Sequence, residues 1–148
     1  MIDQLAVALI DLIGFLNSPQ RDDALLGEAG VDIDRALFPL LVRLDKTGPL
    51  SVAGLADQVG RDHTTISRQL AKLERLGLVS RQGGVGDRRV RTANLTAAGD
   101  KVVQAITSAR QRLLSRALAE WDETDLASLA SLNRRFVDAL RDAGRSHV

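Results

Sequence analysis

Residues 51–82 read SVAGLADQVGRDHTTISRQLAKLERLGLVSRQ, and their pattern predicts the central motif of the protein. Ser51 is a favoured N-cap residue and predicts a short helix over Val52–Val59. Asp62 predicts the cap of a second helix that runs to about Leu76, where a glycine follows. Two short helices joined by a turn that contains glycine are typical of a helix-turn-helix.

The second of these helices carries two different faces. Ile66, Leu70 and Leu73 share one face, and we expect them to pack on the neighbouring helices. The opposite face carries hydroxyl, amide and basic side chains. A helix of this kind fits the major groove of B-DNA, where its first turns approach base edges. The residues expected to contact DNA from this helix are His63, Thr64, Thr65, Ser67, Arg68, Gln69 and Lys72.

Several roles on this face stay open. Arg68 is predicted to bind either guanine, through two hydrogen bonds, or phosphate. Lys72 and Arg75 lie farther along the helix and favour phosphate contacts, whereas His63 is interpreted as a phosphate contact, a base contact or a solvent-exposed side chain. The alternative interpretation of the whole pattern is an ordinary amphipathic helix with a solvated basic face.

After the second helix the pattern changes to that of a β-hairpin. Leu78–Gln82 and Arg89–Leu95 are predicted strands, joined by a glycine-rich tip. An arginine on a narrow loop suits the DNA minor groove, whose negative potential attracts it. Asp87 is expected to orient Arg89 through an ion pair, although a surface ion pair without a functional role is the alternative. The predicted DNA contacts of this wing are Asp87, Arg88, Arg89 and Arg91.

Helices flank this region on both sides. Apolar spacing predicts a first helix over Ile2–Asn17, followed by a short polar stretch with two glycines. A helix that opens at Asp32 or Asp34 is expected to bury Leu37, Leu40, Leu41 and Leu44. A long helix over Ala97–Ala119, capped by Thr96, and a last helix from Asp122 complete the chain. The predicted fold class is mainly α with a small β-hairpin wing.

The charge of the chain is unevenly distributed. Residues 1–60 hold 4 basic and 9 acidic side chains, residues 61–92 hold 8 and 3, and residues 93–148 hold 8 and 7. One central segment is therefore electropositive in a chain whose net charge is only +1. This distribution indicates a localised contact with a polyanion.

The hairpin sequence resembles the wing of MarR-family transcriptional regulators. That wing has an Asp-x-Arg followed by Leu-Thr-x-x-Gly, which Asp87-Arg88-Arg89 and Leu95–Gly99 match. Residues 51–57, 65–70 and 73–81 resemble the family's helix-turn-helix and its junction to the wing. The resemblance covers about residues 35–100, with one departure at Ala93, where the family usually has a larger aliphatic residue.

The resemblance implies a homodimer bound to double-stranded DNA at a pseudo-palindromic operator. Residues 1–148 would form a single MarR-like domain, with residues 1–30 and 100–148 as a helical dimerisation layer and residues 33–99 as the winged helix-turn-helix. It further implies a repressor that is released by a small phenolic or aromatic effector. Phe15, Phe38 and Trp121 are the candidates to line the effector pocket, and plain core packing is the alternative for each.

Other functional classes find little support in the sequence. The chain has no cysteine, and its two histidines, His63 and His147, have no histidine or cysteine partner nearby, so we expect no metal site. No phosphate-binding loop or nucleophile elbow occurs, so we expect neither a cofactor nor an enzyme. The amino terminus lacks a basic region and no apolar run is long enough to cross a bilayer, which predicts a cytoplasmic protein without membrane contact. The remaining alternative is a winged-helix module that binds a protein partner.

Overall fold

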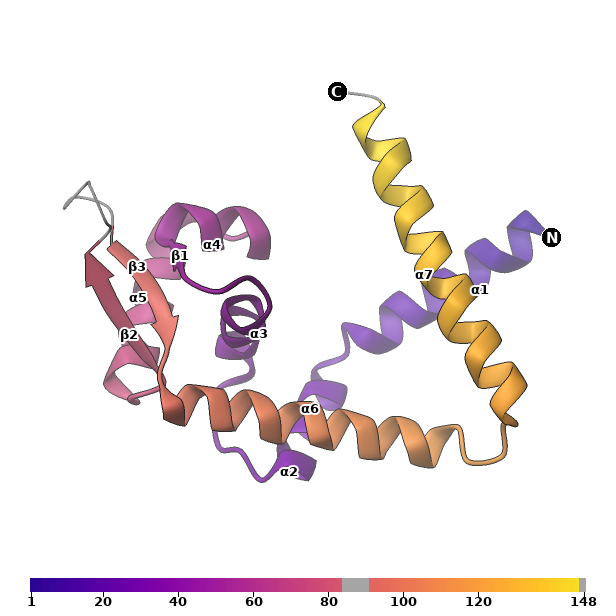
Figure 1. Cartoon of the computed structure of the whole chain (residues 1–148), viewed down its shortest axis with the longest axis horizontal. Coiled ribbons are helices and arrows are strands. Elements are labelled where there is room, and N and C mark those ends of the chain that lie inside the picture. The colour runs from indigo at the N-terminus through magenta and orange to yellow at the C-terminus, as the bar shows by residue number, and fades with distance from the viewer. Residues whose placement is uncertain (84–90, 147–148) are drawn as a thin grey trace. The chain divides into compact units, whose positions relative to one another are not determined.

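The computed structural model describes residues 1–83 and 91–146. The chain forms two compact units, Met1–Arg112 and Leu113–Val148. The first unit contains the predicted helix-turn-helix and hairpin (Figure 1).

Three helices surround the core of the first unit. They are α3 (Phe38–Thr47), α4 (Val52–Val59) and α5 (His63–Arg75). Their leucine-rich faces meet because helical spacing places the apolar residues of each helix on one side. The largest fully buried side chains of this cluster are Leu37, Leu40, Leu41, Leu55, Ile66, Leu70 and Leu73. The buried faces predicted for α3 and α5 are confirmed.

The ends of α4 and α5 follow from local capping chemistry. The Ser51 hydroxyl oxygen accepts a hydrogen bond from the Gly54 amide at 3.1 Å, and an Asp62 carboxylate oxygen accepts one from the Thr65 amide at 2.8 Å. Gly60 follows α4 with a φ of 73°, which is a left-handed conformation that glycine adopts without strain. The two predicted N-caps are therefore confirmed.

A three-stranded antiparallel sheet completes the winged fold. Its strands are β1 (Leu50–Ser51), β2 (Val79–Gly83) and β3 (Arg91–Leu95), in the order β1-β3-β2 (Figure 1). Ala93 of β3 is completely buried and lies directly opposite Arg81 of β2. The two-residue strand β1 was not predicted, because it is too short to show alternation.

The long helix α6 (Ala97–Ala117) begins in close contact with the end of α5. The Thr96 hydroxyl donates a hydrogen bond to the Gly77 carbonyl oxygen at 2.6 Å and accepts one from the Gly99 amide at 3.1 Å. A Cβ atom at Gly99 would overlap the Leu78 carbonyl oxygen. Only glycine lets α6 approach the β2 strand start this closely, so Thr96 and Gly99 together close the joint between α5 and α6.

The segment before α3 differs from the prediction. After α1 (Ile2–Leu16), residues expected to be a polar stretch form α2 (Pro19–Ala29), so that expectation was wrong. Proline suits the first position of a helix, where no amide hydrogen bond is needed, and Leu26 is buried. Arg112 of α6 also binds α2, donating to a Glu28 carboxylate oxygen at 3.1 Å and to the Glu28 backbone oxygen at 3.0 Å.

A short 3-10 helix, η1 (Arg35–Leu37), connects α2 to α3. Asp34 caps it by accepting a hydrogen bond from the Ala36 amide at 2.9 Å, so Asp34 rather than Asp32 is the capping residue. Helix α1 buries none of its residues, although most of them are apolar. Among the described helices, none alone is long and apolar enough to span a membrane; α1 and α2 together have the length but are bent by 56° at their junction.

The second unit consists mainly of α7 (Glu123–Arg145). Asp122 caps it by accepting a hydrogen bond from the Asp125 amide at 2.8 Å, as predicted. The helix buries no residue. Its large apolar side chains Leu129, Leu132 and Leu140 are exposed.

Candidate nucleic-acid interface

Helix α5 presents a polar and basic face to solvent. With Ile66, Leu70 and Leu73 fully buried, the opposite side of the helix is turned outward. The predicted contact residues that are exposed on it are His63, Thr64, Ser67, Arg68 and Lys72, and Arg75 is exposed with them. The structure thus brings these side chains together on one surface, which we call the α5 face.

Thr65 differs from the other predicted contacts because it takes part in the helix cap. Its hydroxyl donates a hydrogen bond to an Asp62 carboxylate oxygen at 2.9 Å, and its amide donates to the other oxygen. These bonds stabilise the ionised carboxylate, and the pKa of Asp62 lies below its ordinary value, chiefly because of the Thr65 amide and then the Thr65 hydroxyl. The hydroxyl proton of Thr65 is therefore already engaged within the protein.

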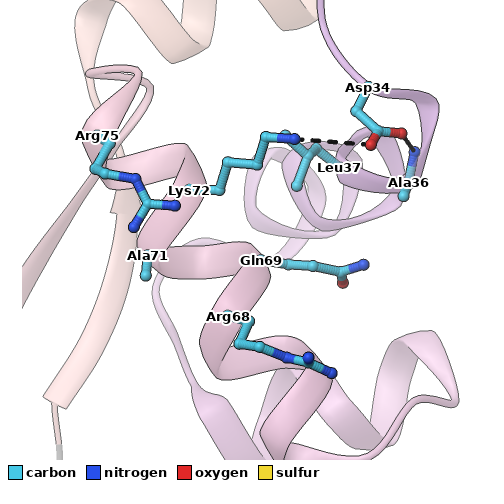
Figure 2. A pocket seen from close by; sticks show the side chains of 8 residues that line it. All are labelled: Asp34, Ala36, Leu37, Arg68, Gln69, Ala71, Lys72 and Arg75. Carbon is cyan, nitrogen blue, oxygen red and sulfur yellow. Dashed lines mark hydrogen bonds and ion pairs between the residues drawn. The ribbon is translucent and has the colours of Figure 1, made fainter.

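A shallow groove of about 350 Å³ runs between α5 and η1. Figure 2 shows Lys72 and Gln69 extending from α5 toward the segment that holds Asp34 and Ala36. The groove is lined by Asp34, Ala36, Leu37, Arg68, Gln69, Ala71, Lys72 and Arg75. Three of these side chains are cationic and one is a carboxylate, so the groove suits an anionic group such as a DNA phosphate.

Among the described residues, Asp34 is the one acidic residue that lines the groove. One of its carboxylate oxygens lies 3.7 Å from the Lys72 ammonium, while the other caps η1 (Figure 2). Both side chains are about half exposed, at 49% for Lys72 and 51% for Asp34. The carboxylate thus competes with any phosphate for the Lys72 charge.

Arg61, in the turn between α4 and α5, connects the α5 face to η1. Its Nη1 donates a hydrogen bond to the Ala36 carbonyl oxygen at 2.7 Å and another to Gln69 Oε1 at 2.9 Å. Neither Arg61 nor Asp34 was predicted as part of the interface. The contacts of Arg61 with Ala36 and of Asp34 with Lys72 join residues far apart in the sequence, and only the basic character of Arg61 in the electropositive segment pointed to it.

Only one of the predicted wing contacts lies in the described part of the chain. Arg91 begins β3, is exposed, and pairs with Gly83 at the end of β2. Asp87, Arg88 and Arg89 lie outside the described residues, so their proposed role remains a prediction.

The three aromatic residues predicted to line an effector pocket do not line the groove. Phe15 of α1 is 53% exposed and has the Arg21 guanidinium 4.4 Å from its ring centre. Phe38 begins α3 and is partly buried, and Trp121 is 46% exposed in the turn before α7. Phe15 and Trp121 therefore do not belong to the buried core of one chain. Within the described residues, no group of three or more histidine or acidic side chains is placed to hold a metal ion.

Comparison with known proteins relates the chain to transcriptional regulators. The sequence profile of the MarR family matches residues 33–90. The uncharacterised HTH-type transcriptional regulator YxaD of Bacillus subtilis is 31% identical over 111 residues, which cover 72% of this chain and 78% of YxaD.

Solved structures share the fold over nearly the full length. A MarR family protein from Bacillus stearothermophilus superposes with a TM-score of 0.80 at 22% identity, covering 95% of this chain and 99% of the other. The ligand-free form of MarR from E. coli gives a TM-score of 0.68 at 25% identity, covering 86% and 96%. The predicted winged helix-turn-helix architecture is confirmed by these structures.

Proposed function

The chain belongs to the MarR family of transcriptional regulators, and from that premise we propose that it is a homodimeric repressor that binds a pseudo-palindromic operator. Membership makes it a DNA-binding regulator rather than an enzyme. The observation that carries the more specific proposal is the α5 face, a polar and basic surface on a helix whose other side is fully buried. Such a helix enters the major groove while basic side chains at its later turns bind phosphate.

The dimer is proposed from apolar surface that one chain leaves uncovered. Helix α1 exposes Ile2, Leu5, Val7, Ile10, Leu12, Ile13, Phe15 and Leu16, and α7 exposes three leucines. Apolar surface of this extent marks a protein–protein contact in a soluble protein. We assign residues 1–30 and 100–148 to a dimerisation layer and residues 33–99 to the DNA-binding region of a single domain.

Two-fold symmetry sets the geometry of the operator. Two α5 helices in successive major grooves lie about 34 Å apart, so the half-sites are inverted repeats centred one helical turn apart. The predicted wing residues would reach the adjacent minor groove. A cytoplasmic location follows from the requirement for DNA.

Salt-dependent DNA binding tests this proposal against a protein-binding module. A dimer that neutralises about eight phosphates loses affinity with a log–log slope near −7 as salt increases. Fluorescence anisotropy with an operator selected from random DNA measures the slope, and light scattering measures the mass of the free protein. A monomer in solution, or binding that salt does not weaken, contradicts the proposal.

Release of the DNA by a small phenolic or aromatic compound is the second part of the proposal. Phe15, Phe38 and Trp121 remain the candidate effector contacts, and the rings of Phe15 and Trp121 are exposed in one chain. The measurement is the affinity for the operator with and without phenolic compounds, made for both the wild type and Trp121→Ala. A compound that weakens operator binding by the wild type should have less effect on the variant. Unchanged affinity across a chemically varied set contradicts effector control of this kind.

A further inference from the structure

The Arg61 side chain donates a hydrogen bond to Gln69, one of the predicted DNA contacts of α5. Gln69 lines the groove beside Arg68 and Lys72, and Arg61 holds its side-chain oxygen at 2.9 Å. The inference drawn from this contact rests on the proposed function, because it concerns the sequence that the α5 face reads.

The chemistry of the contact determines the orientation of the amide group. A guanidinium carries only hydrogen-bond donors, so the Gln69 atom that faces it must be the oxygen. The Gln69 nitrogen then points away from Arg61, and among the described residues none accepts a hydrogen bond from it. Gln69 therefore offers two free N–H donors.

Arg61 is itself held firmly in this position. Its amide donates to the Ala56 carbonyl oxygen at 3.2 Å at the end of α4, and its guanidinium spans from Gln69 to the Ala36 carbonyl oxygen of η1 at 2.7 Å. The side chain is partly buried. Backbone and side chain are thus both anchored, and the Gln69 amide is oriented before DNA arrives.

A free glutamine usually reads adenine, using its oxygen to accept from the adenine amino group and its nitrogen to donate to N7. In this protein one lone pair of that oxygen already accepts from the Arg61 guanidinium, so the amide is held with its oxygen toward Arg61 and its nitrogen away from it. Guanine instead presents two adjacent acceptors, N7 and O6, in the major groove. We propose that Arg61 is a positioning residue that makes Gln69 read guanine in place of adenine.

Selection of binding sites from random DNA tests this proposal in two steps. The wild-type protein is expected to select an operator, and Gln69→Ala is expected to lose the base preference at one position per half-site. At that position the wild type should prefer guanine to adenine by about fivefold, the effect of one net hydrogen bond. Arg61→Met removes the donors but keeps the aliphatic stem, and it should reduce this ratio to one or below.

Two further variants separate positioning from a general loss of charge or stability. Arg61→Lys keeps donors without acceptors and should retain the guanine preference. In the Gln69→Ala background, Arg61→Met should change no base preference, because the group that it orients is absent. An effect that persists in that background, or a guanine preference that survives Arg61→Met, overturns the proposal.

The outcomes also distinguish this inference from the proposed function. If the wild type selects no sequence at all, the proposed function fails and the inference fails with it. If an operator is selected but Gln69→Ala leaves every position unchanged, only the inference fails. Nitrogen-15 relaxation of the Gln69 side-chain amide in the wild-type protein gives an independent check, since an oriented amide is rigid and a freely rotating one would refute the proposal.

Discussion

Replacing Asp34 by asparagine should strengthen DNA binding. The carboxylate lies 3.7 Å from the Lys72 ammonium, and at this distance two unit charges in water attract by about 1 kcal/mol. Because both side chains are about half exposed, the measurable part is about 0.5 kcal/mol. Asp34→Asn removes this competing attraction, so Lys72 binds a DNA phosphate more strongly. The affinity for DNA should rise roughly twofold for each subunit and roughly fivefold for a dimer.

The substitution leaves the local fold in place. Asparagine keeps the side-chain oxygen that accepts from the Ala36 amide at 2.9 Å, and it is as good a capping residue as aspartate. Asp32 provides the matched control. It is exposed, has the same charge, and forms no ion pair with a described residue.

The assay is fluorescence anisotropy with the selected operator at about 0.1 M salt, where only nearby charges act strongly. Asp32→Asn changes the net charge equally but leaves the Asp34–Lys72 pair intact, so it should change the affinity less. Equal gains for the two variants would show that only net charge matters. A weaker complex with Asp34→Asn would refute the competition between Asp34 and phosphate.

Three other variants test separate parts of the structure. Gly99→Ala places a methyl group on the Leu78 carbonyl oxygen and should lower the free energy of unfolding by about 1–3 kcal/mol in urea denaturation; an unchanged midpoint contradicts the close approach. The lowered pKa of Asp62 adds stability that is fully present above its ordinary value of 3.8 and is lost as the pH falls through the lower folded value. The stability difference between wild type and Asp62→Asn should therefore decline only below pH 3.8, and a decline near neutral pH would contradict this assignment. Arg68→Ala should cost about 1–3 kcal/mol at the operator if the arginine reads a base, whereas equal losses on random DNA would assign it to phosphate.

Sequence reasoning succeeded where the signal was local. Ser51 and Asp62 each sit three residues before the amide that they cap, so the starts of α4 and α5 could be read from neighbouring residues. The buried faces of α3 and α5 followed from helical spacing in the same way. These features depend on interactions within one or two turns of helix.

Sequence reasoning failed where the structure depends on contacts between residues that are far apart in the sequence. Helix α2 was missed because its polar composition, with Gly27 inside it and Gly30 directly after it, resembles a loop. Part of its support comes from Arg112, which lies 84 residues from Glu28 in the sequence. The contact between Arg61 and Ala36 spans 25 residues and brings η1 against the α5 face. Nothing in the spacing of these residues indicates that they meet, so the acidic side of the groove and the orientation of Gln69 required the structure.

The hydroxyl of Thr96 also has a mechanical consequence. It bonds to a backbone oxygen just after α5 and to a backbone amide inside the first turn of α6, and the bare Gly99 backbone lies against the same corner. Because these contacts make the connection between α5 and α6 rigid, we expect a rotation of α6 to rotate α5 with it. If the proposed function holds, a compound that tilts α6 is expected to move α5 relative to the operator without contacting the DNA-binding surface.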